Sequence, residues 1–358
     1  MKAARRIAIL LIIATCCGAL GYGLSVAAER VREARRDSGA GLDYSMEWRL
    51  WSAFAAQPPP ALSQAIDPDF PQLLATAYAY GAPEGVEVTE VARRPMPGGQ
   101  LADLRLTIRP AGFALRALHA VHDRPSDAIA IIMHGYQSSA DKVMGEDTPD
   151  YMDEVGATLY AAGADILAMD MPSDPALDAA MNLNLLARGM TVDGVWARAA
   201  CEAIETLRLR QRHATVLLYA VRRAARIGEV FSVLCEPIGQ ILLEPATFDR
   251  RFAVLHDMKR RTLMQPMVLA TQKPLLQRDS FANFAAHARS RTAYIQTEAA
   301  WAEIDDAVRA SFRRVGFDDA RVGVILRKYD TRVANRERVE RLIRGDTIAN
   351  ETVGLEPR

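Results

Sequence analysis

The sequence is poor in the residues from which catalytic and metal sites are usually built. It holds four cysteines and six histidines in 358 residues, and no histidine follows His287. Neither a C-x-x-C nor an H-E-x-x-H spacing occurs, so nothing supports a zinc site. Basic and acidic residues balance at 44 each, which argues against nucleic acid as a partner. We therefore expect no metal ion, no cofactor and no nucleic acid.

The cysteine positions do not establish whether the chain contains a disulfide. Cys16 and Cys17 lie in an N-terminal apolar run, so only Cys201 and Cys235 remain for the body of the chain. These two could pair. Buried free thiols are the simpler interpretation, and we favour it.

The N-terminus has the composition of a targeting segment. Lys2, Arg5 and Arg6 precede an apolar run over residues 7–24, and small residues follow at 25–28. This order is typical of a secretory signal. The run is also close to the roughly 20 residues that span a bilayer. Cleaved signal and uncleaved anchor both stay open, with a slight preference for the anchor, which would contact the membrane. Either case predicts a cell-envelope protein, anchored and facing outward or secreted.

The rest of the chain divides into two parts. Residues 29–85 form a charged juxtamembrane spacer and short N-terminal helices, and residues 86–358 form one domain. From residue 86 to 118 apolar and polar residues alternate, which predicts two or three antiparallel strands with a hairpin loop at 95–99.

Beyond residue 128, short apolar strands alternate with helical segments. We expect strands at 128–133, 164–169, 215–219, 240–243, 292–295 and 322–326, with helices at 151–161, 194–210, 304–315 and 336–343. This alternation predicts an α/β fold with a mostly parallel central sheet flanked by helices. Residues 247–291 are rich in Phe, Leu and Met and predict a helical cap-like insertion, although a packed crossover is the alternative. A cap or a crossover would leave an apolar cleft for a small ligand.

Four segments resemble the α/β-hydrolase family, in particular its dienelactone-hydrolase and acetyl-xylan-esterase-like members. The segments are H-G-Y-Q-S-S at 134–139, G-A-D-I-L-A-M-D-M-P-S at 163–173, A-R-G-M-T-V-D-G-V-W at 187–196, and a strand, turn and helix at 215–228. The resemblance covers roughly residues 100–345. It implies the α/β-hydrolase fold, with a nucleophile on the sharp turn of the last segment.

The residues at the three catalytic positions of the family do not fit its chemistry. Arg222 stands where the resemblance places the serine of G-x-S-x-G, Ala299 stands in place of the acid, and Thr331 in place of the histidine. An arginine is always protonated and cannot attack a carbonyl. We therefore predict a pseudo-hydrolase that binds a small-molecule ligand or a protein partner. The alternative is an active carboxylic-ester hydrolase with relocated groups, such as Ser138 or Ser139 with His134.

The turn itself keeps the small flanking residues that a nucleophile elbow needs. Ala220 and Ala224 flank Val221, Arg222 and Arg223, and an ordinary strand-to-helix connection would favour small residues too. Arg223 and Arg226 are expected to be solvated. Arg222 has two interpretations. It could bind a carboxylate or phosphate, or it could fill a disused pocket and pair with an acid, and we favour the second. The candidate acids are Asp170, Glu298 and Asp330.

His134, Gly135 and Tyr136 correspond to the loop that shapes the oxyanion hole in the family. We expect His134 to be a hydrogen-bonded structural residue rather than a base. His119 and His122 are spaced like a metal-binding pair but lack a carboxylate partner in the sequence nearby. We expect the remaining three histidines to lie on the surface: His213, His256 and His287.

Overall fold

The computed structural model describes seven stretches of the chain, all within its second compact unit, Leu62–Arg358. They are residues 65–109, 112–135, 137–152, 154–171, 175–244, 280–297 and 322–327. The expected targeting segment, Tyr136, Ala299 and Thr331 lie outside these residues, as do the helices expected at 304–315 and 336–343. Of the helices in the described stretches, none has the length and apolar character that crossing a bilayer requires.

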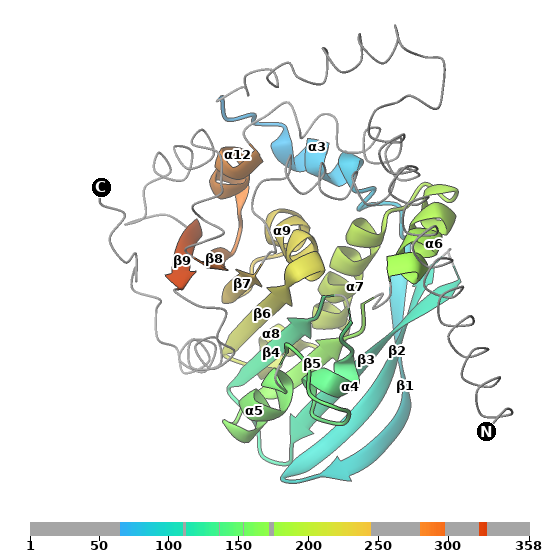
Figure 1. The fold of residues 1–358 in the computed structure, drawn as a ribbon, viewed down its shortest axis with the longest axis vertical. Helices are drawn as coiled ribbons and strands as arrows, with labels where there is room; N and C mark the ends of the chain where they lie inside the picture. The colour runs from blue at the N-terminus through green and yellow to red at the C-terminus, as the bar shows by residue number, and fades with distance from the viewer. Residues whose placement is uncertain are drawn as a thin grey trace, which may run out of the picture. The chain divides into compact units, whose positions relative to one another are not determined.

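A nine-stranded sheet organises the described part of the chain (Figure 1). Its strands lie in the order β1-β2-β3-β5-β4-β6-β7-β8-β9. The first three strands, β1 (Gly85–Met96), β2 (Gly99–Arg109) and β3 (Phe113–His122), pair antiparallel, and β3 also pairs antiparallel with β5. The hairpin between β1 and β2 turns at Gly98, whose φ of 76° favours glycine. The leading antiparallel strands are thus confirmed.

The other six strands run parallel to one another: β4 (Ala128–Met133), β5 (Asp165–Met169), β6 (Thr215–Val221), β7 (Gln240–Glu244), β8 (Arg291–Thr297) and β9 (Val322–Arg327). Each agrees with its predicted range to within two residues. From β4 the chain steps to one side to form β5 and later to the other side to form β6. Ligands bind at the carboxyl ends of parallel strands next to such a reversal, so the edge beyond β4 and β6 is the place to look for a site.

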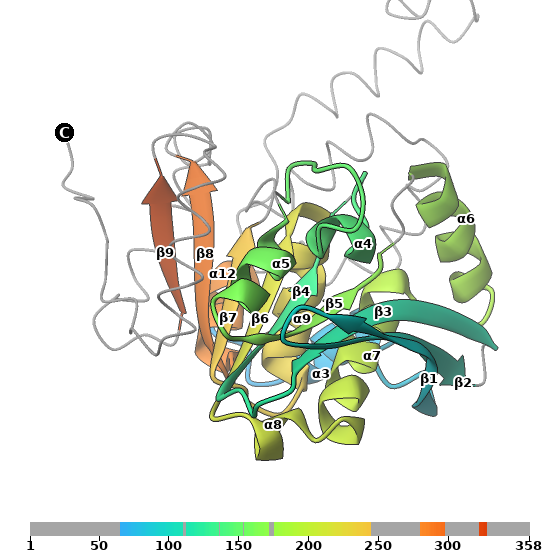
Figure 2. The ribbon, with the colours of Figure 1, turned by 90° about the horizontal axis from the view of Figure 1, so that it is seen from below.

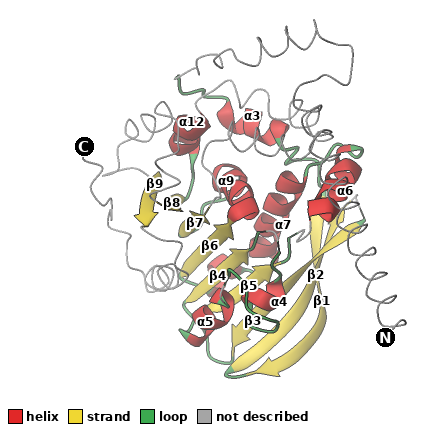
Figure 3. Cartoon of the chain, in the orientation of Figure 1, coloured by secondary structure: helices red, strands yellow, loops and turns green. Residues whose placement is uncertain are grey.

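Helices cover both faces of the sheet (Figures 2 and 3). On one face α3 (Phe70–Ala77), α7 (Val192–Thr206), α9 (Ala225–Leu234) and α12 (Ser280–His287) share one apolar core. On the other face α4 (Ala140–Val143) and α5 (Val155–Ala161) share a second core. Two further helices complete the description: α6 (Pro175–Leu186) and α8 (Leu209–Arg212).

The position of β4 between two apolar cores explains why its sequence is apolar at every position. Ile129, Ile131 and Met133 belong to the first core, whereas Ala130 and Ile132 belong to the second. All six residues of β4 are buried. A strand whose two faces are both covered cannot alternate apolar with polar residues, which is why the continuous apolar run predicted it.

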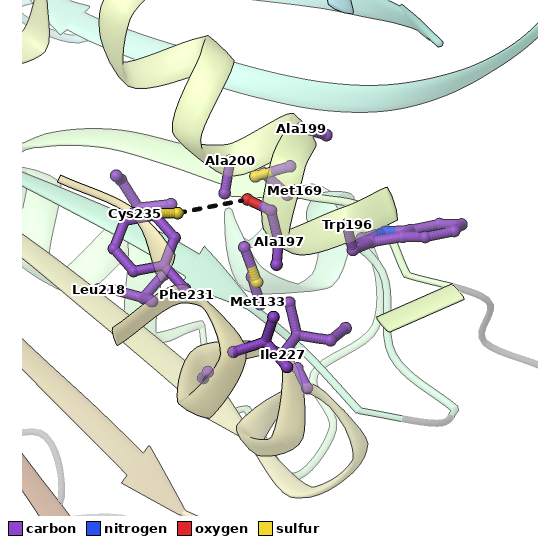
Figure 4. Packing of buried hydrophobic residues seen from close by; sticks show 14 of the residues in the cluster. Met133, Met169, Trp196, Ala197, Ala199, Ala200, Leu218, Ile227, Phe231 and Cys235 are labelled. Carbon is purple, nitrogen blue, oxygen red and sulfur yellow. Dashed lines mark hydrogen bonds between the residues drawn. The ribbon is translucent and has the colours of Figure 1, made fainter. Parts of the chain in front are cut away.

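Helices α7 and α9 pack together beside the sheet, with Cys235 in the same apolar cluster (Figure 4). Cys201 of α7 and Cys235, which follows α9, form a disulfide with their Cα atoms 5.9 Å apart. Our expectation of free thiols was therefore wrong. The sequence could not show that the ends of two helices separated by a strand lie side by side. The disulfide ties the helix after the turn at residue 222 to its neighbour.

Two expected boundaries also change. Helix α3 contributes Phe70, Leu74 and Ala77 to the first core, so the compact domain begins well before residue 86. The helix expected at 194–210 breaks at Arg208, which takes a φ of 53° between α7 and α8. Within the insertion expected at 247–291, residues 245–279 are not described. Its described end, α12, packs against α3 and α9, and the choice between a cap and a crossover stays a prediction.

Candidate functional site

Strand β6 ends in a sharp turn with the geometry of a nucleophile elbow. Val221 closes the strand with extended backbone angles, Arg222 takes a left-handed φ of 54°, and a 3-10 turn η1 (Arg222–Ala224) leads into α9. Ala220 and Ala224 are fully buried at either side of the turn. For a residue with a side chain, a left-handed conformation costs on the order of 1–2 kcal/mol. The packing around this turn must therefore impose it.

The close approach of α9 to the sheet supplies that packing. A Cβ atom added to Gly228 of α9 would lie 2.3 Å from Leu243 Cδ2 and 3.3 Å from Ala220 Cβ. Such contacts leave no room for a larger residue at 228 and little at 220. The small residues of this segment thus let helix and strands meet, and the chain between them has to turn sharply.

The loop after β4 lies directly against this turn. A Cβ atom on Gly135 would be 2.8 Å from Arg222 Cβ and 3.2 Å from Val221 O, so only glycine fits there without a shift of the backbone. Gly135 and Arg222 follow neighbouring parallel strands, and their residues meet at the carboxyl edge of the sheet. The structure therefore brings together two of the candidate site segments, the H-G loop and the elbow.

Arg222 projects from the turn and stacks on an aromatic ring. Its Cζ atom lies 3.9 Å from the centroid of the Tyr151 ring, which is cation–π contact distance. The residue is exposed. It makes no ion pair with any described residue, so it does not pair with Asp170, one of the three candidate acids, while Glu298 and Asp330 lie outside the described residues.

Two buried hydroxyl groups lie near the stacked pair without a hydrogen-bond partner in the described part of the chain. They are Tyr151 Oη, 3.0 Å from the position of a Cβ on Gly135, and Ser138 Oγ. Burial raises the pKa of Tyr151 to about 12, even though the positive charge of Arg222 acts to lower it. The Tyr151 hydroxyl therefore stays protonated at neutral pH and is a potential donor rather than a base.

His134 is enclosed in a hydrogen-bond network and does not face solvent. It is fully buried; its Nδ1 lies 2.8 Å from Gly135 O, and its Nε2 accepts a hydrogen bond from the Met171 N–H at 3.1 Å. Nδ1 must donate, because a carbonyl oxygen only accepts. Asp170 Oδ1 lies 3.3 Å from Nε2. Both ring nitrogens are occupied, so His134 positions the H-G loop and has no nitrogen free for a substrate.

Asp170 follows β5 and is the acidic end of this network. Oδ1 of Asp170 accepts the Ala140 N–H at 2.7 Å, and Oδ2 lies 3.6 Å from Arg116 Nη1. Burial raises the pKa of Asp170, but the contacts with His134, Ala140 and Arg116 outweigh it and lower the pKa below its usual value. Asp170 is therefore a carboxylate whose charge is already compensated.

Arg223 lies next to Arg222 but has a different environment. Its guanidinium pairs with the carboxylate of Asp193, in the first turn of α7, and the two side chains are only 12% and 8% exposed. Arg223 is thus a buried ion-pair partner, and the expectation that it is solvated was wrong. The elbow is fastened to α7 through this pair.

The histidines available for catalysis are few. His213 is buried rather than on the surface, with Nε2 2.9 Å from Asp165 Oδ2, and His122 Nδ1 lies 2.9 Å from Asp165 Oδ1. Both lie at the amino-terminal end of β5, the end opposite to Asp170. His287 is partly buried and donates to Asp67 O. His119 is buried in β3, and His256 lies outside the described residues.

No serine–histidine pair forms among the residues that the structure describes. Ser138 Oγ has no partner, and Ser139 Oγ caps α4 by accepting the Lys142 N–H. The relocated triad built on Ser138 or Ser139 with His134 is therefore not present in this arrangement. Across the same stretches, no three His, Cys, Asp or Glu side chains are placed to hold a metal ion.

Sequence reasoning missed Tyr151 and Asp193 as parts of this region. Tyr151 was expected to begin the helix at 151–161, but it lies in the turn before α5 and contacts Arg222. Asp193 stands after Thr191, which caps α7. The preference for acidic residues in the first turn of a helix could have identified Asp193 from the sequence. Its ion pair with Arg223 could not have been predicted in this way.

Comparisons with known proteins find solved structures that share this fold. No family model and no curated protein matches the chain. Among solved structures, the chain is similar to an acetyl xylan esterase from Paenibacillus sp. R4, with a TM-score of 0.54, 15% identity, and coverage of 80% of this chain and 96% of that one. A glucuronoyl esterase from Solibacter usitatus gives a TM-score of 0.50 and 11% identity, over 82% of this chain and 99% of that one. At such identities the similarity shows the fold alone.

Proposed function

We propose that this chain, which has the α/β-hydrolase fold, is a cell-envelope protein that binds a ligand at its elbow without hydrolysing it. The observation that carries the proposal is Arg222, which occupies the nucleophile position in the left-handed conformation of an elbow. A permanently protonated guanidinium supplies charge and hydrogen-bond donors there but no nucleophile. A ligand held in this place would be bound through its polar groups and left intact.

The placement of the histidines supports the same proposal. Ester hydrolysis by this fold needs a base that can take a proton from the nucleophile. Of the six histidines, the five in described stretches are buried or hydrogen-bonded away from Arg222, and only His256 is left as a candidate. Arg222 and the shortage of histidines are independent observations, and both argue against a triad.

Similarity to solved esterases supports the alternative function, an active carboxylic-ester hydrolase. Such an enzyme would have to recruit a nucleophile other than residue 222 and would depend on His256. Ser138 is one hydroxyl to consider, because it is buried in the loop after β4 and no hydrogen-bond partner is found for its Oγ among the described residues. The alternative function therefore predicts that His256 is essential for activity.

The disulfide between Cys201 and Cys235 supports a location outside the cytoplasm. Disulfides form and persist in oxidising compartments and are rare where thiols are kept reduced. This support is independent of the N-terminal apolar run at 7–24, on which the expectation of export and of a membrane anchor was based.

The decisive experiment is an esterase assay on the purified full-length chain with short acyl esters of p-nitrophenol. We expect no turnover above the uncatalysed rate, and none from Arg222→Ser, because a serine alone has neither base nor acid. His256→Asn provides the comparison. Turnover by the wild type that His256→Asn abolishes would establish the alternative. Turnover gained by Arg222→Ser alone would show that a working base and acid are in place.

A further inference from the structure

The guanidinium of Arg222 is held in a way that suits one class of ligand. Stacking on the Tyr151 ring at 3.9 Å covers one face of the guanidinium and fixes its plane. The N–H donors of a guanidinium point outward within that plane, so stacking leaves them available. Because they are held in a fixed fork, less conformational freedom is lost when a planar oxyanion binds.

No described acid forms an ion pair with Arg222. Asp170, in the adjoining network, accepts the Ala140 N–H and lies beside Arg116. Asp193 is taken by Arg223. Arg222 thus lies at the carboxyl edge of β4 and β6 without an ion-pair partner among the described residues. The amino-terminal end of α9 lies at the same turn and adds positive potential there.

The strained backbone places this charge at the edge where ligands bind in open parallel sheets. A φ of 54° costs less free energy for Gly or Asn than for Arg. Gly or Asn at position 222 would therefore avoid most of this backbone strain. Strain at one residue beside a reversal in strand order is an observation from which a functional role can be inferred.

We infer that Arg222 and Tyr151 form a binding site for a carboxylate ligand, the in-plane N–H groups of the guanidinium holding both carboxylate oxygens. This inference rests on the proposed non-hydrolytic function and names its ligand class. A single compensating charge matches a monoanion. A phosphate monoester carries a charge of about −1.5 to −2 near neutral pH, and one arginine would leave part of it unpaired.

The test is a titration of the full-length protein with benzoate and acetate, followed by calorimetry or by NMR. Methyl benzoate and inorganic phosphate serve as probes that lack the carboxylate. We expect saturable binding of benzoate or acetate, no binding of the neutral ester, and weaker binding of phosphate. Arg222→Gln should weaken carboxylate binding at least about tenfold, because a bidentate charge-assisted contact is lost.

Arg188→Gln is the matched control, since Arg188 is exposed, lies in the turn after α6, and removal of its charge changes the net charge equally. Its binding should equal that of the wild type. Circular dichroism on each variant establishes that the fold is retained. Arg222→Lys keeps the charge without the planar fork and should bind more weakly than the wild type.

Three results would overturn the inference: no saturable carboxylate binding by the wild type, equal binding by Arg222→Gln, or tighter binding of phosphate than of carboxylate. None of them requires that esters be hydrolysed. Turnover of an ester would instead refute the proposed function, so the two failures are distinguishable.

Discussion

Replacing Asp165 by Asn tests the largest buried polar network in the described part of the chain. Asp165 begins β5 and is 2% exposed. Its Oδ1 accepts the His122 backbone N–H and faces His122 Nδ1, both at 2.9 Å, and its Oδ2 faces His213 Nε2 at 2.9 Å. The carboxylate thereby ties the end of β3 and the segment before β6 to the start of β5.

The remaining nitrogen of each ring also faces an acceptor. His213 Nδ1 lies 3.0 Å from Leu209 O, and His122 Nε2 lies 3.1 Å from Tyr160 O. Each ring nitrogen of the two histidines therefore faces an oxygen. An amide at position 165 would present N–H groups to one of these rings and would remove the negative charge of the carboxylate.

The expected loss of unfolding free energy is about 3 kcal/mol. Breaking a buried ion pair by removing one partner costs about 3–5 kcal/mol, and hydrogen bonds to charged groups contribute about 1.5–3 kcal/mol each. Asn keeps an acceptor for the His122 backbone N–H, which places the estimate at the lower end of the first range.

The pH dependence of this loss has a defined sign. Burial raises the pKa of Asp165, but hydrogen bonds from His213 and His122 outweigh it, and the pKa is lowered. For a carboxyl with a lowered folded-state pKa, the stabilisation is present above the unfolded value of about 3.9 and is lost as the pH falls through the folded value. The difference between wild type and Asp165→Asn should therefore shrink in strong acid.

Urea unfolding followed by circular dichroism measures this difference at about pH 7 and at about pH 3, above and below the unfolded value of about 3.9. Asp123→Asn is the control, because Asp123 is exposed, lies just beyond β3, and loses the same charge. A loss below about 0.5 kcal/mol at about pH 7, within the usual effect of a surface substitution, would refute the argument. A loss that grows from about pH 7 to about pH 3 would do the same.

Three further outcomes follow from single sites. Burial lowers the pKa of His119 from 6.5 to about 4, so between these two pH values the unfolded state binds more protons than the folded state. The free energy of unfolding of the wild type should therefore fall by up to roughly 3 kcal/mol from about pH 6.5 to about pH 4. His119→Leu should lose less over the same range in urea unfolding. Arg222→Gly should be about 1 kcal/mol more stable than Arg222→Ala in thermal unfolding, because both lose the stack but only glycine relieves the left-handed strain. Cys201→Ser should cost about 3–4 kcal/mol for a sequence separation of 34 residues, and a reductant should lower the Tm of the wild type but not that of the variant.

The parts of this fold that follow from local patterns were predictable from the sequence. Strand β4 is apolar throughout because both of its faces are covered, and β2 largely alternates because one of its faces is more open. The turn at Arg222 was located from the small residues around it and from its place between a strand and a helix. In each case the signal lies within a dozen neighbouring residues, where hydrophobic periodicity is informative.

The site contacts were not predictable, because they join residues far apart in the chain. His213 follows Arg210, Gln211 and Arg212, and this polar context suggested a surface position. The structure buries it because Asp165, 48 residues earlier, compensates the cost of removing it from water. Arg223 and Asp193 are another such pair, 30 residues apart. Burial of a polar residue depends on its partner, and no local pattern names the partner.

The shape of the elbow does not depend on the chemistry of residue 222. Its left-handed turn follows from the approach of α9 to β6 and β7, which the missing side chain of Gly228 and the small side chain of Ala220 permit. A serine or an arginine at position 222 would meet the same backbone. Packing therefore preserves the shape of this turn whichever of these side chains stands at position 222. The shared fold predicts where a ligand would bind, whereas only the side chains at that edge decide whether it would be hydrolysed.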